Sequence, residues 1–275
     1  MAGFRHELKF IVSADECYRL FEDISPYCDP DPHVGEFQTY EIASIYYDTA
    51  DLRFYYDREE SVAYRRKIRL RSYNRGGKVE ALFIEIKEKH QQYVFKKRIN
   101  LRSQRVLELG IPHQQIPLEL VLEDLVDCAE ARELQYLQRR LQLYPVINIR
   151  YHRRPLIPRY EGDMRITFDS RITAGGDDLG CYDPETEKAI ISSASGVLEI
   201  KTNKAVPIWL QSAMCRYHIA QTRYSKYCLG VDAVYGRAGR GFHPRVQWPA
   251  KELETQGTIV ENAVIEPPIK IAAGA

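Results

Sequence analysis

The sequence predicts an α+β domain in which helices pack against the apolar faces of eight β-strands. Eight segments combine polar–apolar alternation with β-branched and aromatic residues, a pattern typical of strands. Three further stretches carry helix signals, and the 19 tyrosines among 275 residues also favour strands. We expect strands near residues 4–12, 42–48, 63–73, 80–89, 93–101, 146–153, 164–170 and 196–203.

Turn and cap residues connect these segments. Residues 74–77 read Asn-Arg-Gly-Gly, a hairpin signal, so the third, fourth and fifth strands are expected to form an antiparallel meander. Ser13 and Glu16 form a capping box, while Pro117 and Pro207 suit the first turns of two more helices. The helices are expected to span residues 13–24, 117–143 and 207–219.

The bulk composition indicates a single large domain with a tail. We expect the domain at 1–235, and an extended or disordered tail at 236–275, which is rich in Gly, Pro and Ala without a clear period. No apolar run approaches the roughly 18 residues of a membrane span. The six scattered cysteines form no metal-ligand spacing, so we expect reduced thiols and a cytoplasmic location.

Positive charge is concentrated in one part of the chain. The whole chain carries a net charge of +1, but residues 65–105 hold fourteen Lys or Arg and three Glu, a net charge of +11. The remainder of the chain is therefore at −10. This distribution predicts that one region binds an anion.

Six of the expected strands have one charged face and one apolar face, because successive side chains in a strand point to opposite sides. The charged faces carry Arg5, Glu7 and Lys9; Arg65, Lys67, Arg69 and Arg71; Glu85, Lys87 and Lys89; Lys96 and Arg98; Arg165 and Asp169; and Glu199 and Lys201. Two arrangements fit this pattern equally well. One is a closed barrel whose charged faces line a channel, and the other is an open sheet whose charged face meets water. Few aromatic residues accompany the basic ones, so nucleic acid is an unlikely partner.

Short motifs then favour the channel. Eight of them occur in order: Arg-His-Glu-Leu-Lys-Phe (5–10), Ser-Ile-Tyr-Tyr-Asp-Thr (44–49), Ile-Arg-Leu-Arg-Ser-Tyr (68–73), Glu-Ile-Lys (85–87), Lys-Lys-Arg (96–98), Arg-Ile-Thr-Phe-Asp (165–169), Leu-Glu-Ile-Lys (198–201) and Tyr-Ser-Lys-Tyr (224–227). Over about residues 4–230 the chain resembles the VTC domains. These form the polyphosphate-polymerase branch of the triphosphate tunnel metalloenzymes, in the CYTH-like superfamily.

The resemblance implies a closed, eight-stranded antiparallel β-barrel with helices packed outside. It also implies transfer of the γ-phosphate of ATP to a growing polyphosphate chain, with a divalent metal, Mn²⁺ or Mg²⁺. The implied catalytic residues are Arg69, Arg71, Lys87, Lys96 and Lys226. The expected substrate-binding residues are Arg5, Lys9, Lys67, Arg98, Arg153, Arg165, Lys201, Arg223 and Ser225. Glu199 is the expected metal ligand, and Glu7 is either a second ligand or an ion-pair partner of a neighbouring cation.

Two departures from the family pattern leave alternatives open. Arg5 stands where the related phosphatases begin a Glu-x-Glu-x-Lys pattern, which disfavours a two-metal hydrolase. Arg153 shares its parity with Ile147 and Ile149, so its inward position would need a bulge or the strand's end, and Arg150 is the rival. A tripolyphosphate or nucleoside-triphosphate hydrolase and a non-catalytic polyphosphate-binding module are the alternative functions. The sequence leaves open the oligomeric state and a membrane-protein partner.

Overall fold

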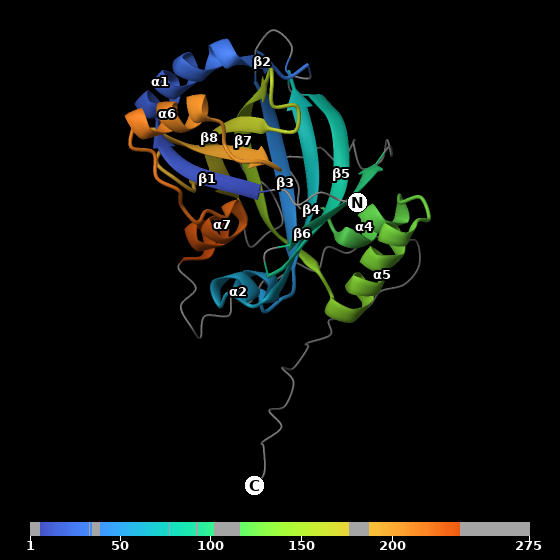
Figure 1. Cartoon of the computed structure of the whole chain (residues 1–275). Helices are drawn as coiled ribbons and strands as arrows, with labels where there is room; N and C mark the ends of the chain where they lie inside the picture. The colour runs from blue at the N-terminus through green and yellow to red at the C-terminus, as the bar shows by residue number, and fades with distance from the viewer. Residues whose placement is uncertain are drawn as a thin grey trace.

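The computed structural model describes residues 6–32, 34, 39–76, 78–91, 93–101, 116–175 and 187–236 (Figure 1). Arg5 and residues 237–275 of the expected tail lie outside the described residues. The strands are β1 (His6–Ser13), β2 (Cys28–Pro30), β3 (Tyr40–Asp48), β4 (Tyr64–Arg75), β5 (Lys78–His90), β6 (Tyr93–Leu101), β7 (Tyr144–Pro158), β8 (Arg165–Gly175), β9 (Lys188–Ala189) and β10 (Ser195–Thr202). The helices are α1 (Ala14–Ile24), the 3₁₀ turn η1 (Ser25–Tyr27), α2 (Arg53–Glu59), α4 (Leu118–Glu123), α5 (Ala129–Leu141), α6 (Ile208–Arg216) and α7 (Lys226–Tyr235).

All the strands join one antiparallel sheet. The eight long strands follow the order β1-β10-β8-β7-β3-β4-β5-β6, and the short β2 and β9 pair with β7 and β8. The α+β class and the eight strand positions expected from the sequence are confirmed, and β4, β5 and β6 form the expected meander.

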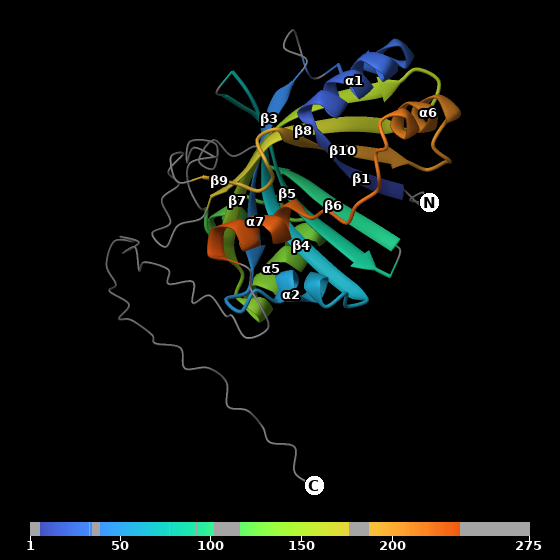
Figure 2. The same cartoon turned by 90° about the vertical axis from the view of Figure 1, so that its left-hand side faces the viewer.

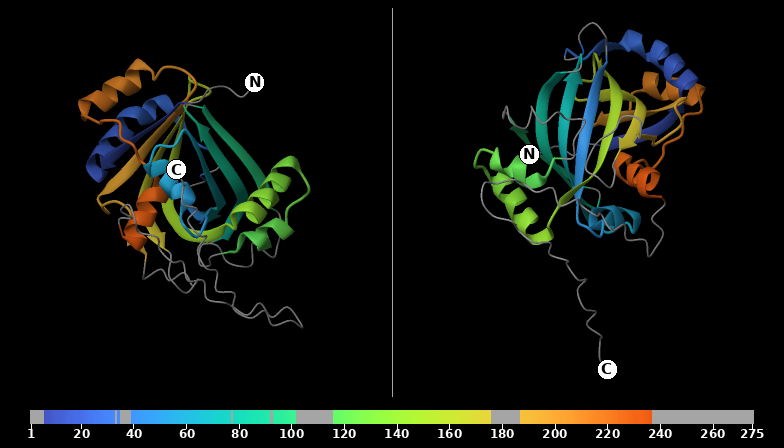
Figure 3. Two further views of the ribbon diagram at one scale, coloured as in Figure 1. Left: turned by 90° about the horizontal axis from the view of Figure 1, so that it is seen from below. Right: turned by 180° about the vertical axis from the view of Figure 1, so that it is seen from behind.

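The expectation of a closed barrel is wrong. The sheet curls into an open half-barrel, and β1 and β6 are its two edges, on either side of the opening (Figures 2 and 3). The outer edge of β1 bonds instead to the segment before α7: Phe10 forms a bridge with Gln221, and the Thr222 N–H donates to the Lys9 carbonyl at 2.9 Å. Because these backbone groups already have partners, that stretch of β1 cannot also pair with β6.

Helices on the convex side cover the apolar faces of the strands, as the alternation predicted. Helices α4 and α5 pack on β3, β4 and β5, where Ile68, Leu70 and Ile84 meet Leu134 and Leu137. Helices α1 and α6 cover β1, β8 and β10 in a second apolar cluster. With the apolar faces buried on the outside, the charged faces are left to line the concave side.

Helix α7 lies on the concave side, where no helix was expected. A Cβ atom at Gly230 would lie 3.1 Å from the Cδ1 atoms of Ile147 and Ile149, so the glycine lets α7 approach β7 closely without displacing these side chains. Arg171 has a φ of 50°, and the register of β7 and β8 shifts beside it, which brings Ala174 into the same cluster. Helix α7 therefore fills one part of the half-barrel with apolar side chains.

The predicted helix starts are confirmed, but two of the predicted helix ends are wrong. The capping box at Ser13 opens α1 as predicted. The single helix expected at 117–143 is two helices, because the chain breaks after Glu123 and the Cys128 side chain caps α5. Helix α6 follows Pro207 as expected but ends at Arg216. None of the described helices is long and apolar enough to cross a membrane.

Candidate active site on the concave face

Charged side chains converge on the concave face. Arg65 and Lys89 lie on this face, at the start of β4 and the end of β5. Among the described residues, ten further cations there contact one of four shared carboxylates or the Ser225 hydroxyl: Lys9, Lys67, Arg69, Arg71, Lys87, Lys96, Arg98, Arg153, Lys201 and Lys226. Four carboxylates lie among them: Glu7, Glu85, Asp169 and Glu199. The ten contacting cations and four carboxylates together carry six excess positive charges, which favour an anionic ligand. We refer to these fourteen side chains as the concave cluster.

Glu85 of β5 is the centre of one part of the concave cluster. Its carboxylate is 1% exposed and lies 2.7 Å from Arg69, 2.7 Å from Lys96 and 2.5 Å from Arg98. Burial would raise the pKa of Glu85, but the surrounding cations outweigh burial and hold the pKa well below its usual range. Burial lowers the pKa of Lys96 to about 8, against the opposing effect of Glu85. One carboxylate thus holds several cations whose mutual repulsion it only partly offsets.

Asp169 of β8 organises a second part. The Arg153 guanidinium donates two hydrogen bonds to its carboxylate, at 2.7 and 2.8 Å, and Lys226 of α7 donates a third at 2.6 Å. Asp169 is 1% exposed, and burial would raise its pKa, but Arg153 and Lys226 lower it. This planar fork fixes the Arg153 guanidinium in one orientation.

The parity that made Arg153 doubtful has a simple explanation. The residues Ile147, Ile149 and Arg153 do share one face of β7, but Ile147 and Ile149 contact α7, which lies on the concave side. The strand therefore needs no bulge of its own to bring Arg153 inward. Its rival Arg150 points to the other face, where it forms an ion pair with Glu41 at 2.7 Å.

Glu7 of β1 and Glu199 of β10 lie near each other: the charge of Glu199 raises the pKa of Glu7, and Lys9 and Lys201 lower the pKa of both carboxylates. Lys87 of β5 reaches Glu7 at 2.6 Å, which links the two sides of the half-barrel opening. Lys201 lies 2.5 Å from Glu199. Burial would raise the pKa of Glu7, but Lys87 and Lys9 lower it to about 2. Both carboxylates are therefore ionised at neutral pH.

Hydroxyl groups complete the concave surface. Tyr46 accepts a hydrogen bond from Arg69 at 2.9 Å, and Ser44 and Tyr151 accept from Arg71 at 3.3 and 3.2 Å. Burial would raise the pKa of Tyr46, but Arg69, Arg71 and Lys67 lower it to about 8. The lowered pKa of Tyr46 thus reflects the positive potential of the surface.

The start of α7 adds to this potential. Ser225 caps the helix by accepting from the Cys228 N–H at 3.3 Å, and it also accepts from Lys67 at 2.7 Å. A helix N-terminus carries a partial positive charge that attracts anions, and the N-terminus of α7 lies at the concave cluster.

Among the described residues, two expected binding cations contact neither the carboxylates of the concave cluster nor Ser225. Arg165 lies on the same face as its cross-strand neighbour Lys201, but it pairs with Asp31, and its side chain is 40% exposed. Arg223 acts electrostatically on Lys89 near the end of β5, so it lies at the rim rather than deep in the half-barrel. Arg5 is outside the described residues.

The donor set fits a hard divalent cation that also binds substrate phosphates. In the described part of the chain, no three His, Cys, Asp or Glu side chains lie close enough together to hold a metal ion. Glu199 and Glu7 supply carboxylate oxygens, and Mg²⁺-like ions are commonly bound by one or two carboxylates together with phosphates and water. These two residues are the ones that could hold such an ion.

Reasoning from the sequence missed several contacts. Asp169 was placed on the charged face but given no role, although it holds Arg153 and Lys226. Lys87 pairs with Glu7 of β1 across the opening, a contact between distant strands that the sequence did not indicate. The inward parity of the motif at 165–169 was the available signal for Asp169, but pairings between distant strands leave no local pattern.

Comparisons with known proteins agree with the motifs. The VTC domain family matches residues 4–235. The vacuolar transporter chaperone complex subunit 4 of Trypanosoma cruzi is 24% identical over 227 residues, covering 71% of this chain. The present chain spans 28% of that protein's length.

Two solved structures are also similar. A Bacillus halodurans protein described as an adenylate cyclase has a TM-score of 0.48 at 14% identity, covering 81% of this chain and 93% of its own. The PH1819 protein of Pyrococcus horikoshii has a TM-score of 0.42 at 13% identity, covering 82% and 99%. The family match extends over most of the chain and includes every residue of the concave cluster. The chain therefore belongs to the VTC domain family.

Proposed function

We propose that this chain is a polyphosphate polymerase that transfers the γ-phosphate of ATP to a growing polyphosphate chain on its concave face. The observation that carries the proposal is the excess of six positive charges in the concave cluster, on the face that the family motifs line. Such a surface is self-repulsive without a ligand, since unit charges about 5 Å apart at an effective dielectric constant of 20 repel by roughly 3 kcal/mol. A dense polyanion relieves that repulsion.

The side chains of the cluster bind and orient the phosphates. Arg69, Arg71 and Arg153 are each held by a carboxylate or hydroxyl partner, so their guanidinium groups are fixed before a ligand arrives. A fixed guanidinium can fork two phosphate oxygens, whereas an ammonium such as that of Lys96 acts as a point charge. The binding surface is extended by Lys9, Lys67, Arg98 and Lys201. At its margins the polyphosphate is guided by Arg165, Arg223 and Ser225.

Catalysis in this proposal comes from position and charge. Phosphoryl transfer requires alignment of the attacking and leaving oxygens and neutralisation of the charge that develops between them. Arg69, Arg71, Lys87, Lys96 and Lys226 supply that neutralisation. The acceptor is the terminal phosphate of the chain, which is already anionic, so no side chain has to remove a proton.

Glu199, with Glu7 beside it, is proposed to hold one divalent cation, Mn²⁺ or Mg²⁺. When bound, such a cation would supply further positive charge to the phosphate oxygens. The two carboxylates also have a role of their own, because they orient Lys201, Lys9 and Lys87.

The proposal extends to partners and location. The Trypanosoma cruzi relative is named as a subunit of a complex, and this chain covers 28% of its length. We propose that the chain acts in the cytoplasm together with further subunits, among them a membrane protein. Affinity purification of the tagged chain with crosslinking would test this part, and recovery of the chain alone would contradict it.

The direct experiment incubates the purified chain with ATP and Mn²⁺ and resolves the products on a polyacrylamide gel. Polyphosphate that lengthens with time is the expected result. Release of orthophosphate without polyphosphate would indicate a triphosphate hydrolase instead of a polymerase. Tight polyphosphate binding with no turnover of ATP would indicate a binding module.

A further inference from the structure

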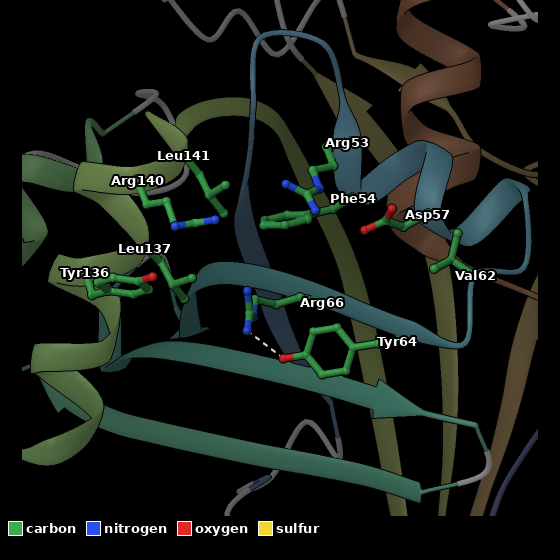
Figure 4. Close-up of a pocket in the computed structure, with 10 residues that line it drawn as sticks. All are labelled: Arg53, Phe54, Asp57, Val62, Tyr64, Arg66, Tyr136, Leu137, Arg140 and Leu141. Atoms are coloured by element: carbon green, nitrogen blue, oxygen red, sulfur yellow. Dashed lines mark hydrogen bonds between the residues drawn. The ribbon is translucent and has the colours of Figure 1, made fainter. Parts of the chain in front are cut away.

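A second cationic pocket lies on the convex side of the sheet, outside the concave cluster. It has a volume of about 360 Å³ and lies between α2, the start of β4 and the end of α5 (Figure 4). This volume is within the range of about 300–1,000 Å³ that is usual for small-molecule sites. We call it the convex pocket.

Three arginines from three different elements point toward the space of the convex pocket: Arg53 of α2, Arg66 of β4 and Arg140 of α5 (Figure 4). Arg53 acts electrostatically on Asp57, and no hydrogen bond or ion pair of the Arg53 or Arg140 guanidinium occurs among the described residues. Asp57 is the carboxylate that lines the pocket with them. Glu88, which is ion-paired with Arg66, lies beside them, so three cations against two anions leave one excess positive charge, which favours an anionic ligand.

Arg66 is held in place before any ligand binds. Its Nη2 atom lies 2.9 Å from Glu88 and donates to the Tyr64 hydroxyl at 2.5 Å, and its guanidinium lies over the Tyr64 ring at 5.2 Å. Glu88 is held in turn by Lys97 at 3.2 Å. The Arg66 side chain is only 17% exposed, so its direction is fixed, and fixed donors bind a phosphate at a lower entropic cost.

The convex pocket and the concave cluster are on opposite faces of the same strand. Arg66 and Lys67 are consecutive residues of β4, and Lys67 points inward to Ser225 while Arg66 points outward to Glu88. The sheet separates the two sites, so a ligand in one does not fill the other.

The remaining lining adds an apolar surface and one hydrogen-bond acceptor. Phe54 and Leu137 are buried and form the apolar part, with Leu141 beside them. Burial raises the pKa of Asp57, while Arg53 and Arg66 lower it, and the pKa remains above its usual value. In Figure 4 the Asp57 carboxylate points into the pocket, where it would repel a second phosphate but accept hydrogen bonds from hydroxyl groups.

We infer that the convex pocket binds a small organic phosphate that carries hydroxyl groups, such as a sugar phosphate or the sugar phosphate part of a nucleotide. The phosphate contacts Arg53, Arg66 and Arg140. The sugar presents its hydroxyl groups to Asp57 and its carbon atoms to Phe54 and Leu137.

The test measures binding of ribose 5-phosphate, AMP and inorganic phosphate by isothermal titration calorimetry. Ribose 5-phosphate is expected to bind at least tenfold more tightly than inorganic phosphate, and Asp57→Asn to reduce that preference. AMP serves to distinguish a sugar phosphate from a nucleotide as the natural form. Equal affinity for phosphate and ribose 5-phosphate would overturn the assignment of the ligand class.

Variants locate the site. Arg53→Ala/Arg140→Ala is expected to weaken ribose 5-phosphate binding at least tenfold, and because both side chains are exposed, the melting temperature should stay within a few degrees of wild type. Arg139→Ala is the matched control, since Arg139 is an exposed neighbour on α5 that does not line the pocket. Lys96→Ala, on the concave face, should leave ribose 5-phosphate binding unchanged whether or not the chain is a polymerase. Loss of binding in Lys96→Ala, or its retention in the double variant, would overturn the inference.

Discussion

Replacing Glu85 with glutamine tests whether one buried carboxylate holds the concave cluster together. The change keeps the shape of the side chain but removes the negative charge that lies within 2.7 Å of Arg69 and Lys96 and 2.5 Å of Arg98. Removing one partner of a buried ion pair typically costs about 3–5 kcal/mol, because the remaining charges stay buried without compensation. At about 2–4 °C per kcal/mol for a chain of this size class, the melting temperature of Glu85→Gln should fall by roughly 6–20 °C.

The same change should strengthen the response to an anion. The concave cluster goes from six to seven excess positive charges, so tripolyphosphate should raise the melting temperature of Glu85→Gln by more than it raises that of wild type. For scale, a ligand at one hundred times its Kd stabilises the folded state by about 2.7 kcal/mol. Calorimetry with and without tripolyphosphate measures both effects.

Acid should reduce the stability difference between wild type and Glu85→Gln. The pKa of Glu85 in the folded protein lies far below its ordinary value of 4.5. The ionised carboxylate therefore stabilises the folded state above about pH 4.5, and this stabilisation is lost as the pH falls below that value. Glu41→Gln is the matched control, because Glu41 pairs with Arg150 on the other face of the sheet. A Glu85→Gln protein as stable as wild type, or one with a smaller tripolyphosphate shift than Glu41→Gln, would refute the reasoning.

Two further predictions concern the metal and the tyrosines. Glu199→Gln should abolish metal-dependent turnover while polyphosphate affinity holds or rises, as a Mn²⁺ titration with parallel binding measurements would check; an affinity loss as large as that of Lys96→Ala, with normal metal dependence, would refute it. Tyr46, whose pKa the nearby cations lower to about 8, should ionise near that pH in the ligand-free protein. Tripolyphosphate neutralises those cations and should raise the pKa of Tyr46, so the phenolate absorbance should decrease on binding. The Tyr46→Phe variant should lack this decrease, because it has no phenol at this position. An absorbance that tripolyphosphate leaves unchanged would count against this prediction.

Local pattern was enough to predict the strands and their faces. In β4, for example, Ile68 and Leu70 alternate with Lys67, Arg69 and Arg71, and this period of two decides which side chains are buried by α5. Because all the charged faces turn to one side of the sheet, the alternation also identified most of the concave cluster.

Features that depend on distant parts of the chain were not predicted. Closure of the barrel depends on whether β1 and β6 meet, and the backbone pairing of β1 with Gln221 decides against it. Helix α7 is buried on several sides, so it lacks the polar–apolar period that marks a surface helix, and α2 has only seven residues. The pairing of Asp169 with both Arg153 and Lys226 joins three segments that are far apart in sequence.

The most direct test of the account compares two adjacent lysines of β6. Lys96 points to Glu85 on the concave face, whereas Lys97 points to Glu133 of α5 on the convex face. The rate of polyphosphate formation from radiolabelled ATP and Mn²⁺ should fall about 10²–10³-fold in Lys96→Ala, the cost of removing one contact to the transition state. Lys97→Ala should retain a rate close to that of wild type. Equal losses in the two variants, or a larger loss in Lys97→Ala, would contradict the claim that the concave face is the active site.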